Sequence, residues 1–332
     1  MRLLVTGGSG FLGGFLLREA AARGHTCVAL ARSDAAAAVV TKAGAAPLAG
    51  DLSGTSAHLA DTFSAANCDV LVNLASLGFG HAPGIVAAAE DAGLRRSVFV
   101  STTAVSTSLP AASKRVRLAA EASIRSSRLN WTIVRPTMIY GAPGDRNLSR
   151  LLAALRRAPV FPVPGGGGRL QQPVHVTDLA SAIMTAAERD SAAGRIYEVA
   201  GPEPLTFTRL LEVSAEAVAS RARFVPVPLS AALAAIRGYE RLSKHPRIRA
   251  EQLLRLAEDK AFAIDDAARD LDYAPRSFDA GIQAEARALG LAACQQHPKG
   301  SAKVPKTASK ARYDNQIIAF QPMGRLRKGK GS

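Results

Sequence analysis

The residues with the clearest chemical potential are three glycines near the N-terminus. Gly7, Gly10 and Gly13 stand three residues apart in the stretch Thr-Gly-Gly-Ser-Gly-Phe-Leu-Gly, which follows the apolar run 3–5. Without side chains, such a turn lets backbone N–H groups approach a pyrophosphate at a helix N-terminus. A helical apolar pattern over 15–21 and a second strand over 27–31 complete a βαβ unit. The stretch predicts a dinucleotide site, and a tight turn without a ligand is the alternative.

The residue after the second strand bears on which dinucleotide is preferred. An acidic residue there would hold the ribose 2′-hydroxyl of NAD, whereas an arginine accommodates the 2′-phosphate of NADP. Ala31 occupies the acidic position and Arg32 follows it. A guanidinium group matches a phosphate with a bidentate fork, so we expect NADP(H) to be preferred, with NAD(H) as the second choice. An ordinary exposed arginine at a strand end is the alternative.

Strand-like and helix-like segments then continue to alternate along the chain. Buried strands are predicted over 69–75, 97–101 and 131–136, and helices over 84–92 and 113–126. This alternation predicts an α/β fold, a Rossmann-type doubly wound parallel sheet with a smaller C-terminal substrate lobe. Ligands in such sheets lie at the carboxyl ends of the strands.

Length and composition divide the 332 residues into three regions. We expect an NAD(P)-binding Rossmann domain over 1–136, with later elements around 170–200 interleaved, and a mainly substrate-binding lobe over 137–291. The stretch 292–332 holds nine Lys or Arg and one acid, and its lack of an apolar period predicts a disordered basic tail.

Charge distribution and cysteine usage limit the kinds of binding partner that we expect. Much of the net charge of +15 belongs to the tail, where aromatic residues are too sparse for base stacking, so no specific nucleic acid is expected. The three scattered cysteines lack the spacing of a metal site or disulfide framework. No apolar stretch is long enough to span a membrane, and a cytoplasmic location with a small-molecule substrate is expected.

Several motifs together resemble the extended or atypical short-chain dehydrogenase/reductase superfamily, which includes nucleotide-sugar epimerases and dehydratases. The resemblance covers positions 3 to about 290 in family order. The matching stretches are 6–13, Gly50-Asp51-Leu52, Asn73-Leu74-Ala75, Ser101-Thr102-Thr103, Arg135-Pro136 with Tyr140-Gly141, 174–180 and 273–276.

The resemblance implies where a nicotinamide dinucleotide would bind. Asp51 would contact the adenine amino group, and Leu74 and Ala75 would line the nicotinamide ribose. Asp51 could instead cap the turn that follows it, and Asn73 could satisfy backbone groups within the sheet. The cofactor-binding residues predicted in this way are Gly7, Gly10, Phe11, Leu12, Gly13, Arg32, Asp51, Leu52, Ala75, Lys114 and Pro136.

The resemblance also implies catalytic residues. Thr102, with Thr103 as the neighbouring alternative, stands where the family places the hydroxyl that polarises a substrate carbonyl, and Lys114 stands where the family places its lysine. Active members carry a tyrosine four residues before that lysine, which exchanges a proton with the substrate oxygen. Pro110 occupies that position, and none of the five tyrosines has a lysine four residues later. Lys114 as a solvated helix lysine is the alternative.

Two classes of function remain open on this reading. The first is an NADP(H)-dependent oxidoreductase or epimerase/dehydratase acting on a carbonyl or nucleotide-sugar-like substrate. The second is a non-catalytic NADPH-binding protein, similar to the accessory subunit of respiratory complex I. Gln171 stands where nucleotide-sugar enzymes carry a diphosphate-binding arginine, which weakens that substrate class unless Arg169 substitutes. We expect Asp178 and His175 to be structural, and the family resemblance implies that a homodimer could form.

Overall fold

Seven parallel strands form the central sheet of the protein. A computed structural model describes residues 1–109, 112–142, 144–243 and 249–292. The strand order is β11-β6-β5-β4-β1-β2-β3, and every pairing in this sheet is parallel. The strands are β1 (Arg2–Thr6), β2 (Thr26–Ala31), β3 (Ala46–Ala49), β4 (Val70–Asn73), β5 (Arg96–Val100), β6 (Asn130–Pro136) and β11 (Arg195–Val199).

Strand β1 lies where the winding of the sheet reverses. It pairs with β2 on one side and with β4 on the other, so that Leu4 lies opposite both Val28 and Leu71. All three side chains are buried, as expected for a strand that is covered on both faces. The glycine turn therefore leaves the sheet at its topological switch point, where doubly wound sheets bind ligands.

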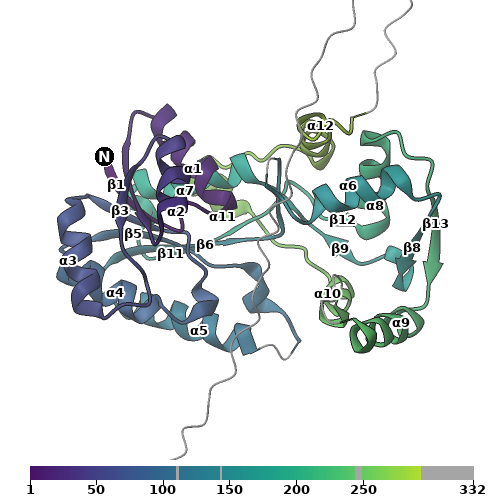
Figure 1. Ribbon diagram of the computed structural model, residues 1–332, viewed down its shortest axis with the longest axis horizontal. Helices are drawn as coiled ribbons and strands as arrows, with labels where there is room; N and C mark the ends of the chain where they lie inside the picture. The colour runs from purple at the N-terminus through teal and green to yellow at the C-terminus, as the bar shows by residue number, and fades with distance from the viewer. Residues whose placement is uncertain (110–111, 143, 244–248, 293–332) are drawn as a thin grey trace, which may run out of the picture. The chain divides into compact units, whose positions relative to one another are not determined.

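Helices cover both faces of the sheet (Figure 1). One face carries α1 (Phe11–Ala22), α2 (Asp34–Lys42), α7 (Val176–Glu188) and α11 (Asp265–Leu271). The other face carries α3 (Ser56–Ala66), α4 (Ala82–Asp91) and α5 (Ala112–Arg125). The prediction of a Rossmann-type doubly wound sheet is confirmed. Across the described residues, no helix combines the length and apolar character needed to cross a membrane.

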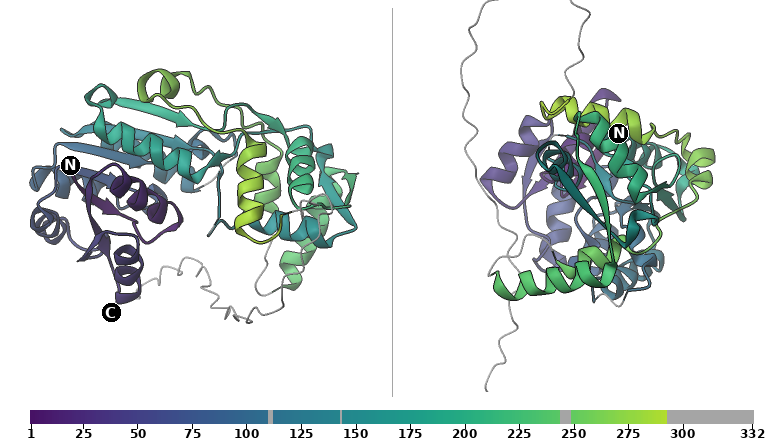
Figure 2. Two further views of the ribbon diagram at one scale, coloured as in Figure 1. Left: turned by 90° about the horizontal axis from the view of Figure 1, so that it is seen from above. Right: turned by 90° about the vertical axis from the view of Figure 1, so that its right-hand side faces the viewer.

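The second half of the chain builds a smaller lobe with its own apolar core (Figure 2). Three of its helices share that core, and its longest strands pair in parallel. Its helices are α6 (Leu148–Arg157), α8 (Phe207–Ala217), α9 (Leu229–Leu242), α10 (Ala250–Leu256) and α12 (Phe278–Ala288), and its strand pairs are β8 (Val160–Pro164) with β13 (Arg223–Val227), β7 (Ile139–Tyr140) with β10 (Val174–His175), and β9 (Leu170–Gln171) with β12 (Leu205–Thr206).

Residues Met1–Ala293 form one compact unit, within which α7 and β11 return from the lobe to the sheet. The predicted boundary at residue 136 falls inside this unit and stays a prediction. The predicted tail, 292–332, lies outside the described residues except for Ala292.

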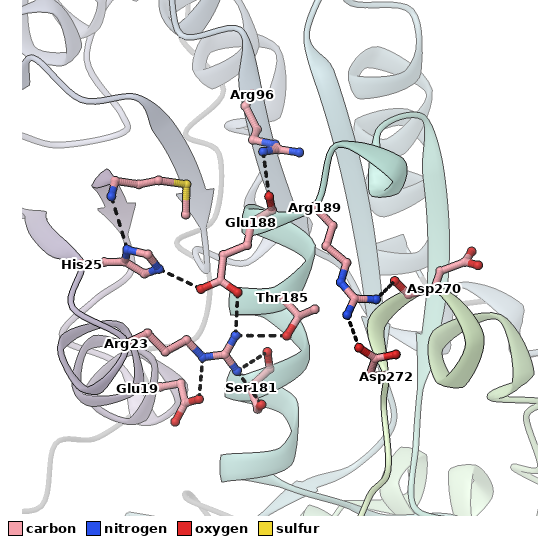
Figure 3. Close-up of polar contacts among 11 residues, drawn as sticks. Glu19, Arg23, His25, Arg96, Ser181, Thr185, Glu188, Arg189, Asp270 and Asp272 are labelled. Carbon is pink, nitrogen blue, oxygen red and sulfur yellow. Dashed lines mark hydrogen bonds and ion pairs between the residues drawn. The ribbon is translucent and has the colours of Figure 1, made fainter.

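An ion-pair network fixes α7 against α1 (Figure 3). The Arg23 guanidinium donates to Glu188 at 2.9 Å, to the Ser181 hydroxyl at 2.7 Å and to the Thr185 hydroxyl at 3.0 Å. The ring of His25 lies 2.7 Å from the other Glu188 oxygen. The network thus ties the end of the first βαβ helix to a helix more than 150 residues later in the chain, next to the buried α1–α7 contact.

Candidate cofactor and substrate site

The glycine turn brings the N-terminus of α1 to the carboxyl edge of the sheet. Gly10 is the residue before the helix, and no side chain caps the helix there. The neighbouring helices α2 and α3 are capped by the hydroxyls of Ser33 and Thr55. An N-terminus without a side-chain cap offers its amide groups and its dipole to an anion. The turn therefore fits the pyrophosphate predicted from its glycines.

Two of the glycines are required by close backbone approach. Gly7 has φ of 72°, and a Cβ there would lie 2.8 Å from the Ala75 nitrogen. A Cβ at Gly13 would lie 2.2 Å from the Gly8 carbonyl oxygen. These contacts press α1 and the turn against the ends of β1 and β4. The next two predicted residues follow on α1, where Leu12 is buried and Phe11 is half-buried against Phe15.

Arg32 and Asp51 lie together at the ends of β2 and β3. Arg32 is exposed, and its charge helps to lower the pKa of the Asp51 carboxyl. The larger effect on this pKa comes from Ser53, whose backbone N–H and hydroxyl both donate to Asp51 Oδ1 at 2.9 Å. Asp51 therefore caps the following turn, the role given above as the alternative to adenine binding. Leu52, next to it, is half-buried.

At the end of β4, Asn73 is structural in the way proposed as its alternative role. Its side chain is buried, accepts the Thr6 hydroxyl at 2.5 Å and donates to the Ala75 carbonyl at 3.1 Å. These bonds hold Ala75 beside Gly7, so the ends of β1 and β4 have one fixed arrangement.

The three hydroxyl residues after β5 differ in their partners. Ser101 donates to Glu121 at 2.5 Å, and Thr103 is buried and donates to the Pro136 carbonyl at 3.3 Å. Thr102 caps a short 3₁₀ turn (Thr103–Ser106) by accepting the Ala104 N–H at 3.2 Å. That contact uses a lone pair of the hydroxyl, and no described residue accepts its proton. Thr102 is therefore better placed than its two neighbours to donate to a ligand.

A cavity of about 1040 Å³ opens beside Thr102. It lies between the end of β5 and the lobe, because Met138, Leu151 and Phe207 line it together with Thr102. Among the residues that the structure describes, no tyrosine lines this cavity. Three tyrosines instead pack deep in the fold: Tyr197 donates to Asp270, Tyr273 donates to the Ala200 carbonyl, and Tyr140 packs against His175 and Phe278.

Helix α5 directs Lys114 and Arg117 differently. Lys114 Nζ donates to the Thr107 carbonyl at 2.5 Å, and Lys114 is not among the residues that line the cavity. Ser113 and Arg117 do line it, four residues apart, which is the spacing of the family's tyrosine and lysine. The guanidinium lies over Gly78, where a Cβ would be 3.2 Å from Arg117 Nη2. Pro110, predicted to replace the tyrosine, lies outside the described residues.

Arg117 lines the cavity although no motif of the sequence singles it out. Its spacing to Glu121 was the available signal, because residues four apart share one face of a helix. Glu121 is buried and pairs with Arg135 at 2.5 Å, so this face of α5 is turned toward the sheet and the strand ends.

His175 and Asp178 contribute to the framework. His175 is buried, and its Nδ1 accepts the Thr177 N–H at the start of α7. His175 is the capping residue of α7, because the helix begins one residue after it. Burial lowers the pKa of His175 to about 4. Asp178 forms an ion pair with Arg276 at 2.7 Å.

Comparisons with known proteins identify the class. The model of the NAD(P)H-binding family matches residues 7–156. The chain is 32% identical over 315 residues to the 4-hydroxy-2-methyl-3-oxo-4-farnesyl-3,4-dihydroquinoline-1-oxide ketoreductase of Stigmatella aurantiaca, covering 83% of this chain and 92% of that protein. The chain belongs to the extended short-chain dehydrogenase/reductase superfamily, and its N-terminal half is a nicotinamide-nucleotide-binding domain.

Two further relatives and one solved structure are also similar to this chain. The 2-alkyl-3-oxoalkanoate reductase of Stenotrophomonas maltophilia is 27% identical, covering 85% of this chain and 98% of its own. The NADH dehydrogenase [ubiquinone] 1 alpha subcomplex subunit 9 of Arabidopsis thaliana is 34% identical, but over only 46% of this chain and 38% of its own. The UDP-glucose 4-epimerase structure from Thermotoga maritima shares the fold, with a TM-score of 0.67, 15% identity and coverage of 87% and 99%.

Proposed function

We propose that this protein is an NADPH-dependent ketoreductase. The observation that supports it best is the cavity at Thr102, which meets the cofactor edge of the sheet and which the lobe lines in part with apolar side chains such as Met138, Leu151 and Phe207. Two relatives that match over most of their length are named as reductases of oxo compounds. A nucleotide-sugar substrate is less well supported, since Gln171 donates to the Glu258 carbonyl and Arg169 pairs with Asp259 at 2.9 Å.

The dinucleotide would lie along the carboxyl edge of the sheet. Its pyrophosphate would lie at the N-terminus of α1, over Gly7, Gly10 and Gly13. Arg32 would bind the 2′-phosphate of NADP, and Asp51 Oδ2 would face the adenine. Phe11, Leu12, Leu52, Ala75 and Pro136 would line the remaining contacts.

The NADPH preference is tested by Arg32→Gln. A charge-assisted hydrogen bond contributes about 1.5–3 kcal/mol, so Kd for NADPH should rise about tenfold or more while Kd for NADH stays within twofold. The matched control is Lys42→Gln, an exposed cation at the end of α2. Titration of the reduced-nicotinamide fluorescence measures both constants. An equal loss for both cofactors would refute the 2′-phosphate contact.

A reduced nicotinamide held at this edge would provide the hydride for the carbonyl carbon. The Thr102 hydroxyl would donate to the carbonyl oxygen, a bond that strengthens as negative charge develops there. The proton that completes the alcohol would come from solvent and reach the oxygen through hydroxyl groups that line the cavity. Thr107 and Ser108 line the cavity, but both donate to Glu258. Ser106 and Ser113 also line it and have no hydrogen bond to Glu258, so they are the hydroxyls that would pass the proton.

The positive charge beside the cofactor ribose has two candidates on α5. Lys114 is the residue that the family resemblance indicates, and Arg117 is the one that the cavity wall presents. Lys114→Met and Arg117→Met separate them: the variant that removes the functional cation should raise Kd for NADPH and lower kcat, and the other should leave both within twofold.

Turnover is tested by NADPH oxidation with a panel of 3-oxo esters and aryl ketones. Thr102→Val should lower kcat/KM about a hundredfold, because it removes a donor to the developing oxyanion, and should leave Kd for NADPH unchanged. Thr41→Val, on the exposed side of α2, is the control. A Thr102→Val enzyme with full activity would exclude Thr102 from catalysis.

The second candidate function is a non-catalytic NADPH-binding protein. It is favoured by the lack of a tyrosine four residues before any lysine and by the partial match to a respiratory-complex subunit. The purified protein would then carry or bind NADPH tightly, and no carbonyl compound in the panel would oxidise it.

A further inference from the structure

The cavity at Thr102 is lined by both apolar and charged side chains. Met138, Leu151, Phe207 and Leu210 are apolar. The charged side chains come from α5, from α6 and from the end of α10 onward, among other segments. A ligand that fills the cavity therefore has to be amphiphilic.

Positive charge exceeds negative charge on the described lining. Its acids are Glu258 and Asp259 alone, and both are already engaged. Asp259 pairs with Arg169 at 2.9 Å, and Glu258 accepts hydrogen bonds from Thr107 and Ser108. The cations of the lining are Arg117, Arg146, Arg150, Arg169, Arg255 and Lys260.

Three of these cations lie near one another. Burial lowers the pKa of Arg117, and the charge of Arg255 lowers it further. Burial also lowers the pKa of Lys260. The charge of Glu258 raises this pKa in part, and the charge of Arg255 lowers it further. Arg255 forms an ion pair with Glu251, one turn earlier on α10, at 2.6 Å. Like charges gathered in a half-buried cavity are costly unless an anion joins them.

We propose that the substrate carries an anionic group, a carboxylate or a phosphate, which Arg255 and Lys260 bind while its apolar part packs against Met138 and Phe207. The substrate class is thus an anionic oxo compound with an apolar chain. This inference rests on the proposed function for the carbonyl, but the anion site can be measured without turnover.

Calorimetry on the full chain with non-reducible probes tests it, with and without saturating NADPH. Octanoate is compared with octanamide, and octyl phosphate with octanol, so that each pair differs in charge. At least one anion should bind about tenfold or more tightly than its neutral partner, and its affinity should fall as salt rises. The two pairs decide between carboxylate and phosphate.

Arg255→Gln with Lys260→Gln should bring the preferred anion down to the affinity of its neutral partner. Arg255→Lys with Lys260→Arg keeps both charges and should keep most of the preference. Arg125→Gln, an exposed cation at the end of α5, is the control and should change nothing. Circular dichroism checks that each variant is folded.

Three results would overturn the inference: neither anion binds, both neutral partners bind equally well, or Arg125→Gln weakens the anion as much as the double variant does. The proposed function fails separately. If octanoate binds but no oxo acid oxidises NADPH, the anion site is supported and the ketoreductase activity is refuted. If a 3-oxo acid and its ester are turned over equally well, the ketoreductase activity is supported and the anion site is refuted.

Discussion

At the scale of single residues, hydrogen-bond partners separate three adjacent hydroxyls. Ser101 is committed to a buried carboxylate and Thr103 to a carbonyl, whereas Thr102 accepts a backbone N–H and keeps its proton for another partner. The family resemblance favours Thr102, with Thr103 as the alternative. The structure supports this choice, because Thr102 and Thr103 both line the cavity but Thr103 already donates to the Pro136 carbonyl.

The glycine turn provides a prediction at the same scale. Gly13→Ala places a Cβ 2.2 Å from the Gly8 carbonyl oxygen, so α1 must shift away from the turn. Overpacking of this kind costs about 1–3 kcal/mol, and we expect the urea midpoint to fall and NADPH binding to weaken together.

Gly14→Ala is the matched control for that change. Its nearest neighbour would be the mobile end of the Arg18 side chain at 3.7 Å, and alanine favours a helix over glycine by about 1 kcal/mol. We expect the free energy of unfolding to stay equal or rise. An equal loss of stability in both variants would contradict the close-approach argument.

At the scale of elements, the orientation of α5 decides which of its side chains line the cavity. Side chains four apart share a face, so Ser113, Arg117 and Glu121 lie together toward the strand ends. Lys114 is rotated by about 100° from Ser113, and it reaches the Thr107 carbonyl instead. The family resemblance indicates Lys114, and only the docked helix shows which face meets the cavity.

The α1–α7 network gives a prediction about elements. Burial alone would raise the pKa of Glu188, but hydrogen bonds from His25 and Arg23 and their charges lower it overall. A carboxyl with a lowered folded pKa adds stability above its unfolded pKa and loses it as pH falls through the folded value. Glu188→Gln should therefore lower Tm at neutral pH and reduce the acid-side slope of stability.

Thermal unfolding between neutral and acidic pH measures this effect. Glu203→Gln is the control, because that carboxylate is exposed. If Glu188→Gln and Glu203→Gln show the same Tm and the same pH slope, the network does not hold α7 to α1.

At the scale of the whole molecule, the lobe core contains a buried carboxyl that responds to pH. Burial and the neighbouring Asp145 raise the pKa of Glu285, on α12, to about 8. The folded protein therefore keeps Glu285 protonated at neutral pH, whereas the unfolded chain ionises it near 4.5. Stability should fall as pH rises from about 4.5 to about 8, by at most about 1.4 kcal/mol per pH unit.

Glu285→Gln should remove this decline and make the protein more stable than the parent above pH 8, as measured by urea unfolding across the pH range. Glu216→Gln, an exposed carboxylate on α8, should leave the decline in place. A parent protein whose stability is flat over this range would show that Glu285 ionises normally.

The sequence alone predicted the doubly wound parallel sheet and the glycine turn after its first strand. Apolar runs, glycine spacing and turn residues act over a few neighbouring positions, so these local patterns can be recognised in the sequence without the structure. The tertiary structure decided the contents of the cavity. Thr102, Leu151 and Arg255 come from distant parts of the chain, and packing of the lobe on the sheet brings them to one cavity. Whether Lys114 or Arg117 lines the cavity depends on how α5 is rotated about its axis. Buried contacts set that rotation, and sequence spacing alone does not specify them.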